Sequence, residues 1–362
     1  MRVSAPCRFR ATSFRLPMRH GRRFSHRALA QHIDFPSIRR HMKGNTPATP
    51  LNDAQQAGFL LPRVPFQKQA LDLAAQRALL VQRGMTIADP ARAEHYLRFI
   101  GYYRLSGYWF PFQHRNGGDD HDNFQPGTDF ETVLDRYVFD RRLRVLIMDA
   151  SERIEVAART AISNALSERA GPHWYLDPAQ FDPVFNHGDF MRRVRQETGI
   201  DPFNRHKQSE FIRHYLRKYD QPPEPPSWMV FELLPFGTVS IVFKHLLDAD
   251  KKLIAQDFGL PRDRLQSWLH ASSHLRNLCA HHSRVWNREF GVVPSVARSE
   301  RHHVTQFKRF YNHAVAIQTL LKRISGDTHW ADRLQALLAD HPNIPIQLMG
   351  FPADWSTKPI WQ

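Results

Sequence analysis

Side chains that can transfer protons or bind anions follow helical spacing in a segment that begins at Leu265. The segment has the sequence LQSWLHASSHLRNLCAHHSRVWNREF. At 100° per residue one stripe of it is polar, and this stripe consists of His270, His274, Asn277, His281 and Arg284. Imidazole exchanges protons near neutral pH, and a guanidinium keeps its charge and can hold a phosphate. The stripe is therefore a candidate chemical site, and the alternative is a polar helix face or an oligomer contact with incidental histidines.

The other side of this segment is apolar and predicts a buried helix face. Its members follow spacings of three and four, and they are Trp268, Ala271, Leu275, Leu278, His282 and Val285. The pattern predicts one helix over about 262–287, starting at Pro261 and Asp263. His282 falls on the core side, whereas His281 lies one turn after Asn277 on the polar stripe. His281 is therefore preferred over His282 as the histidine that transfers protons.

Helices must position this segment, because strand signals are almost absent from the chain. Residues 130–169 contain no Pro and no Gly and have apolar side chains at helical spacing, which predicts one long helix that Gly171 and Pro172 end. Further helices are predicted at about 66–82, from Asp89 onward, and at about 207–219, 238–249 and 303–324. The fold class is therefore all-α, with a helical bundle and a small N-terminal helical region.

Four regions are predicted along the chain: an Arg-rich extension at 1–50, an N-terminal helical region with an aromatic block at 51–127, the bundle at 128–325, and a C-terminal helix with an extended tail at 326–362. Residues 1–41 hold ten arginines and one acid, for a net charge of +9, and the remainder has +6. This extension is interpreted as translated upstream sequence before a start at Met42, as a disordered basic arm, or as a targeting segment.

Composition excludes several classes of protein. A chain of 362 residues with 42% hydrophobic content can fill a sizeable core, and no apolar stretch is long enough to cross a bilayer. We expect a soluble, cytoplasmic protein without membrane partners. Two cysteines, Cys7 and Cys279, allow no disulfide framework. The sequence has no P-loop, no G-x-G-x-x-G and no G-x-S-x-G motif, and no cofactor is expected.

Arg276 to His281 fits the R-N-x-x-x-H pattern of the HEPN ribonuclease superfamily, and the wider sequence resembles the Abi family of bacterial proteins, which are tied to abortive infection and phage resistance. The blocks that carry this resemblance are IGYYRLSGYWFPF at 100–112, YVFDRRLR at 137–144, PSWMVFELLPFGTVS at 226–240, LRNLCAHHSRVWNR at 275–288 and MGFPADW at 349–355. The likeness covers about 60–362.

The resemblance implies metal-independent endoribonuclease activity on an HEPN-like bundle. The ribose 2′-OH would attack the adjacent phosphate and leave a 2′,3′-cyclic phosphate. His281 would move protons, Arg276 would hold the phosphate, and Asn277 would orient either group. On an ideal helix Arg276 and His281 lie 140° apart, so that one copy is an incomplete site; HEPN proteins are dimers that appose two motifs, and a homodimer is implied.

A second interpretation is a non-catalytic module. The same scaffold would hold RNA, such as a small regulatory RNA, or a protein antitoxin, without cutting.

Other residues are weighed beside the motif. Asp140 is a candidate partner for Arg276, and Arg284 and His282 are candidate supporting residues; the alternative for Asp140 is an i to i+4 pair on a solvated face. Glu232 is predicted to pair with an arginine inside the bundle. The sequence contains no H-E-x-x-H motif. A metal site built from His281, His282, His302 and His303 is therefore disfavoured, and no metal is expected.

An aromatic block over 102–112 suggests base stacking. The candidate RNA-binding residues are Tyr103, Arg104, Tyr108 and Trp109. Stacking needs exposed rings, and packing of the N-terminal region onto the bundle is the favoured alternative.

Overall fold

The structure is a computed structural model that describes Pro65 and residues 69–362, except 115–119 and 302–303. In this part of the chain every regular element is helical, and β-pairing is limited to isolated bridges. The all-α class is confirmed. The described helices belong to one compact unit, Gln69–Gln362. The predicted extension at 1–50 and the start at Met42 lie outside the described residues, and the boundaries at 127/128 and 325/326 stay predictions.

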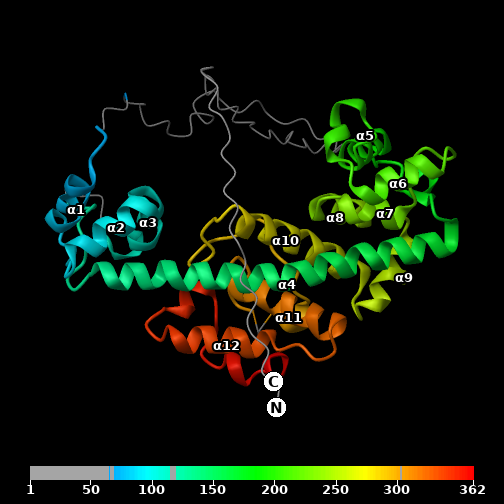
Figure 1. The fold of residues 1–362 in the computed structure, drawn as a ribbon. Coiled ribbons are helices and arrows are strands. Elements are labelled where there is room, and N and C mark those ends of the chain that lie inside the picture. The colour runs from blue at the N-terminus through cyan, green and yellow to red at the C-terminus, as the bar shows by residue number, and fades with distance from the viewer. Residues whose placement is uncertain (1–64, 66–68, 115–119, 302–303) are drawn as a thin grey trace, which may run out of the picture. The chain divides into compact units, whose positions relative to one another are not determined.

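The long helix α4, Phe130–Ala170, is the central element of the fold (Figure 1). It starts where the Asp129 carboxylate accepts the amide of Thr132 at 2.8 Å, and it ends at Gly171, whose φ of 86° lies in the left-handed region. Its 41 residues span about 60 Å. The uninterrupted helix is confirmed, and it gives the other helices one shared surface.

Eleven further α-helices are described around α4. They are α1 (Leu73–Gln82), α2 (Pro90–Phe99), α3 (Tyr102–Trp109), α5 (His187–Thr198), α6 (Glu210–Lys218), α7 (Ser227–Leu233), α8 (Phe236–His245), α9 (Asp248–Asp257), α10 (Arg262–Ala280), α11 (Phe310–Ile324) and α12 (Trp330–Asp340). Of these, α3, α7, α8, α9, α10, α11 and α12 contact α4 directly. Helices α1–α3 gather at the N-terminal end of α4 and α5–α9 at its C-terminal end, while α11 and α12 are drawn below α4 in the view of Figure 1.

Several predicted helices differ from the observed ones. The single helix predicted at 238–249 is two helices, α8 and α9, which an extended backbone at Leu246 and Leu247 separates. The last predicted helix, 303–324, begins only at Phe310. The sequence interpretation also missed α3, α5 and α7, because each contains or adjoins Pro or Gly.

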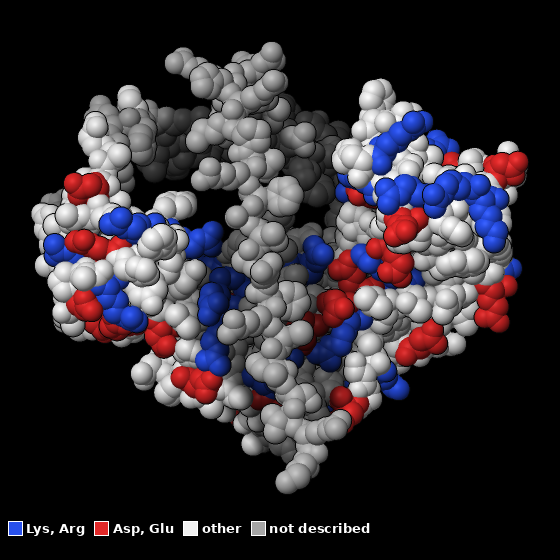
Figure 2. All heavy atoms as spheres, viewed as in Figure 1, with Lys and Arg blue, Asp and Glu red and all other residues white. Residues whose placement is uncertain are grey.

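Lys and Arg side chains are unevenly distributed on the face shown in Figure 2. They gather over α5 and α6, and also beside α3 and α10, where the candidate motif ends (Figure 2). Clusters of this kind favour anionic partners.

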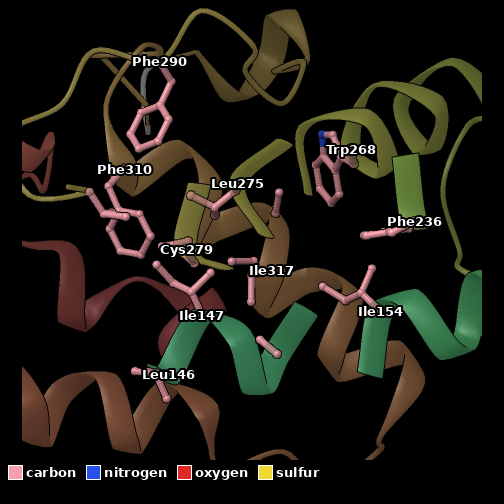
Figure 3. Packing of buried hydrophobic residues seen from close by; sticks show 14 of the residues in the cluster. Leu146, Ile147, Ile154, Phe236, Trp268, Leu275, Cys279, Phe290, Phe310 and Ile317 are labelled. Atoms are coloured by element: carbon pink, nitrogen blue, oxygen red, sulfur yellow. The ribbon is translucent and has the colours of Figure 1, made fainter. Parts of the chain in front are cut away.

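The hydrophobic core forms where α4, α10 and α11 meet (Figure 3). Ile147 of α4 lies beside Cys279 of α10 and Ile317 of α11, whereas Ile154 lies toward Phe236 of α8, and all five side chains are buried. This packing fixes the rotation of α10 about its axis, and therefore the direction in which its polar stripe faces.

No helix in the described part of the chain combines the length and the apolar character that a membrane crossing requires.

Candidate functional site

The motif lies at the C-terminal end of α10 rather than in its middle. Arg276 and Asn277 belong to the last helical turn, and His281 is the residue after Ala280, with its amide bonded to the carbonyl of Asn277 at 3.0 Å. His282 then adopts a left-handed φ of 57°, which a non-glycine residue rarely takes without a reason. The helix predicted to 287 is therefore wrong in about its last two turns, and the chain turns sharply beside His281.

The cause of this turn is Asp140 on α4. Its carboxylate is completely buried and accepts the amides of Val285 at 3.0 Å and Trp286 at 2.7 Å. Continuing α10 to 287 would place both amides in the helix, so these tertiary bonds replace the helical ones. Asp140 thus holds the segment that follows the motif against the long helix.

The remaining partners of Asp140 are Tyr108 and Arg144. Tyr108 donates its hydroxyl to Asp140 at 2.6 Å, and Arg144 forms a close ion pair with the same carboxylate. Burial raises the pKa of Asp140, while Arg144, Tyr108 and the two amides oppose that rise. The predicted pairing of Asp140 with Arg276 is wrong. Asp140 does form an i to i+4 ion pair, with Arg144, as the alternative predicted. This pair is buried, whereas the prediction placed it on a solvated face.

Arg276 pairs with Glu155 instead. Its Nε lies 3.4 Å from Oε2 of Glu155 on α4, and one of its Nη atoms lies 3.5 Å from the side-chain oxygen of Asn277. Glu155 is buried and also pairs closely with Arg159, whose guanidinium donates to the carbonyls of Glu232 and Leu234. A chain of charged contacts therefore links the motif to α4 and to the end of α7.

Glu232 does not pair with a described arginine inside the bundle through its carboxylate, as was predicted. Its side chain is exposed, and only its backbone carbonyl accepts from an arginine. The charge needs no buried partner, because it points to solvent. The acid that sequence analysis missed is Glu155, whose only signal was its i to i+4 spacing with Arg159 inside an apolar stretch of α4.

A basic groove opens beside the end of α10. It has a volume of about 620 Å³, and we call it the α3–α4–α10 groove. Its lining residues are Phe99, Ile100, Arg104, Tyr137, Arg141, Arg144, Val145, Met148, Cys279, Ala280 and His282. Three of these are arginines, and none is an acid. Such a lining suits a phosphate group or another anion.

Arg104 connects this groove to the motif. One of its Nη atoms donates to the carbonyl of His282 at 2.8 Å, which helps to hold the left-handed turn. His281 and His282 are both exposed, so the placement of His282 on the core stripe is wrong. The turn lifts His282 out of the helical register, and its imidazole lines the groove instead.

Cys279 also lines this groove, but it is not a nucleophile. Burial raises the pKa of its thiol to about 12, so that the thiol stays protonated at neutral pH.

Arg284 has a structural position. Its Nη1 donates to the carbonyls of Trp286 at 2.9 Å and Asn287 at 3.2 Å. Its Nε lies close to Gly107 of α3, since a Cβ atom added to that glycine would be 3.5 Å away. Burial lowers the pKa of Arg284. This candidate supporting residue therefore closes the loop after the motif instead of facing the groove.

The aromatic block divides into buried and exposed rings. Tyr108 and Trp109 are buried, and the former is committed to Asp140, so their candidate role in RNA binding is wrong. Helix α3 is short, and its apolar side packs on α4, which leaves no free face for these rings. Tyr103 is 92% exposed and Arg104 is exposed, so these two remain available to a ligand.

The polar stripe of α10 is confirmed at its exposed positions. His270, Asn277 and His281 are exposed and His274 is half-buried. Partial desolvation lowers the pKa of both His270 and His274. A further histidine that the sequence did not single out, His313 on α11, is fully buried near His274, and burial lowers its pKa to about 3.

Metal ligands are not grouped around the motif. Among the described residues, no set of three or more His, Cys, Asp or Glu side chains is arranged to hold a metal ion. His302 and His303, which entered the metal alternative, lie outside the described residues.

Comparison with known proteins identifies a family. A family model described as Abi-like protein matches residues 95–287, slightly more than half of the chain, and the match includes α3, α4, α10 and the complete motif. No curated protein and no solved structure matches this chain.

Proposed function

Because the chain belongs to the Abi-like family, we propose that it acts in abortive infection against bacteriophage as a metal-independent endoribonuclease of the HEPN type. The observation that carries this proposal is the junction of the motif with the groove. The exposed His281 directly follows Ala280, which lines a groove that contains three arginines and no acid. In this proposal the site binds an RNA strand at neutral pH. The protein acts in the cytoplasm and uses no cofactor.

The reaction we propose is an internal transfer at phosphorus. The ribose 2′-oxygen bonds to the adjacent phosphorus while a base takes the proton of the 2′-OH. The bond from phosphorus to the 5′-oxygen breaks, and an acid protonates that oxygen, which yields a 2′,3′-cyclic phosphate and a 5′-OH. His281 fills one of these roles, and Arg276 stabilises the charge on the phosphate oxygens.

Arg276 is held for this task by Glu155. The ion pair uses Nε and leaves the guanidinium half-exposed, so a phosphate can reach it. Asn277, next to it, is exposed and contacts Arg276 through its side-chain oxygen. We propose that Glu155 and Asn277 position the arginine, and that the arginine touches the substrate.

A second copy of the chain completes the site in this proposal. One protomer supplies one copy of the motif histidine, His281, whereas the reaction uses both a base and an acid. Apposing two motifs in a homodimer provides both groups.

The alternative is a non-catalytic module that binds a small regulatory RNA or a protein antitoxin. The Arg276 to Glu155 ion pair also fits this alternative, because an arginine that serves only a structural network makes the same contact. It predicts salt-sensitive RNA binding without turnover.

The experiment is cleavage of mixed single-stranded and transfer RNA by the purified full chain in excess EDTA, with mapping of the product ends. We expect wild type to leave cyclic phosphates, and His281→Ala and Arg276→Ala to be inactive. His270→Ala is the matched control, because His270 is an exposed histidine on the same helix, about three turns before His281. Retained cleavage in both motif variants contradicts the enzyme, and RNA retention without products supports the binding module.

A further inference from the structure

A second groove lies at the other end of α4, between α6, α7 and the segment that follows α4. It has a volume of about 400 Å³, and we call it the α6–α7 groove. Its lining includes the rings of His173, His214, Tyr215, Tyr219 and Trp228, together with Met229 and several prolines. No acid lines it. None of these residues belongs to the motif or to the basic groove beside it.

The rings in this groove are unusually open to solvent. Tyr219 is 48% exposed and Trp228 is 52% exposed. Most large rings in this chain are buried, including Trp174, Trp286 and Trp330. Exposing half of a tryptophan and half of a tyrosine on one groove leaves apolar surface that a ligand can cover.

The position of Trp228 follows from local structure. It is the second residue of α7, directly after a proline-rich turn, and its neighbour Ser227 is buried and bonded to Ser163 and Ser167 of α4. Tyr215 is tied to the same turn, since its hydroxyl donates to the carbonyls of Pro222 and Glu224. The walls of the groove are therefore anchored, and only the ring faces are free.

Helix α6, which contributes His214 and Tyr215 to this groove, also carries positive charge. Arg213, Arg217 and Lys218 lie on α6, all three are exposed, and none of them pairs with a described carboxylate. Arg217 and Lys218 follow His214 by three and four residues, so they share its face of the helix. The Nζ of Lys218 lies 5.3 Å from the centre of the Tyr219 ring. Figure 2 shows the blue side chains over this part of the molecule.

The occupant that fits both features is a polyanion with flat, stackable groups. Unpaired nucleotides stack on aromatic rings while their phosphates meet Lys and Arg. A proline-rich peptide also fits an aromatic groove, but it has no use for the cations of α6. We propose that the α6–α7 groove binds a single-stranded segment of RNA, distinct from the segment at the motif.

The long helix sets the separation between the two grooves. Met148 of α4 lines the groove beside the motif, and Pro172, just after α4, lines the α6–α7 groove. At 1.5 Å per residue these positions are about 36 Å apart. At the duplex rise of about 3.4 Å per nucleotide this distance corresponds to roughly ten nucleotides. A single strand of about 30 nucleotides can occupy both grooves of one protomer.

This inference rests on the proposed function only in taking RNA as the partner, and its test does not require cleavage. Binding of a labelled 30-nucleotide single-stranded RNA is measured by fluorescence anisotropy with the full chain carrying His281→Ala. We expect Trp228→Ala and Tyr219→Ala each to raise the Kd at least about fivefold, which is the range for loss of one stacked base. Trp228→Phe should restore most of the affinity.

Two matched controls accompany these variants. Phe203 is 91% exposed in the same lobe but does not line the groove, so Phe203→Ala should bind RNA like the parent. The double variant Arg217→Gln, Lys218→Gln should flatten the dependence of log K on log salt by up to about 1.4, because each phosphate contact on a single strand contributes about 0.7. Arg192→Gln should leave that slope unchanged, because Arg192 is paired with Asp189.

The outcomes separate this inference from the proposed function. Parent-like RNA binding in both aromatic variants, with thermal melting unchanged, overturns the α6–α7 groove as an RNA site even if the motif variants still abolish cleavage. Capture of a proline-rich peptide that Trp228→Ala abolishes, with RNA binding unaffected, overturns it as well. Absence of RNA binding in every variant overturns both this inference and the proposed function.

Discussion

Nε of Arg276 lies 3.4 Å from Oε2 of Glu155, and this contact joins the motif on α10 to the central helix α4. Glu155 is buried and is shared with Arg159, so one carboxylate balances two guanidinium groups. The geometry makes Glu155 a positioning residue for Arg276 and gives it a role in stability.

Replacing Glu155 should therefore affect both stability and RNA processing. Glu155→Gln leaves Arg159 and Arg276 close together without a balancing charge, and we expect the free energy of unfolding to fall by about 1–3 kcal/mol. Chemical denaturation measures this change. Cleavage by the folded variant should fall through kcat more than through KM, because Arg276 is misdirected rather than removed. Glu152→Gln, one turn earlier and exposed, is the control and should match wild type in both assays.

The hydroxyl of Tyr108 should matter for folding and not for RNA contact. Tyr108→Phe removes the 2.6 Å hydrogen bond to the buried Asp140, and we expect a loss of about 1–3 kcal/mol in the free energy of unfolding. Tyr103→Phe should stay within about 0.5 kcal/mol of wild type, because that ring is almost entirely exposed. Equal stability of the two variants would contradict the assignment of Tyr108 to the Asp140 network.

Arg141 should act as a phosphate contact in the α3–α4–α10 groove. It lines that groove and is exposed, whereas its neighbour Arg142 pairs with Asp340 at 2.7 Å outside it. We expect Arg141→Gln to weaken RNA binding regardless of sequence and to reduce the salt slope by about 0.7. Arg142→Gln removes the same charge from the chain and should leave the slope unchanged. Titrations at several salt concentrations distinguish the two, and equal slopes would count against the groove.

His313 should make stability depend on pH. Burial lowers its pKa to about 3, so between about pH 6.5 and pH 3 the unfolded chain binds a proton at this residue that the folded chain does not. Stability therefore falls as the pH is lowered through this window, by up to about 1.4 kcal/mol per unit from this group. Burial also lowers the pKa of His173, His270 and His274, and these groups contribute in the same direction.

The measurement is the free energy of unfolding of wild type and His313→Gln at several pH values. The variant should show a shallower decline between pH 6.5 and pH 4. His206→Gln, which changes an exposed histidine, should retain the wild-type slope. Parallel curves for wild type and His313→Gln would show that this buried imidazole is not responsible.

Local sequence rules predicted the long helix and the polar stripe of α10 well. The absence of Pro and Gly over 130–170 is sufficient for α4, since nothing interrupts its hydrogen bonds, and capping by Asp129 marks its start. The exposed positions of His270, Asn277 and His281 follow from helical periodicity, because the apolar side of α10 packs on α4. These features depend on neighbours in the chain.

The end of α10 and the partners of its charges could not be predicted in this way. The helix stops at Ala280 because Asp140, about 145 residues earlier in the sequence, takes the amides of Val285 and Trp286. The same long-range pairing exposes His282. Glu155 and Arg276 are likewise 121 residues apart, and the choice between Asp140 and Glu155 as the partner of Arg276 depends on the rotation of α4. Such contacts arise only in the packed structure.

The bonds between Asp140 and the two amides also determine how the motif moves. A loop that followed α10 without tertiary contacts would open often, and its amides would exchange with solvent deuterium quickly. Here the amides of Val285 and Trp286 are buried on a carboxylate that α4 and α3 also hold, so they can be released only when that packing opens. The backbone next to His281 should therefore exchange as slowly as the core, and the motif should lose its shape only when the central helices unfold.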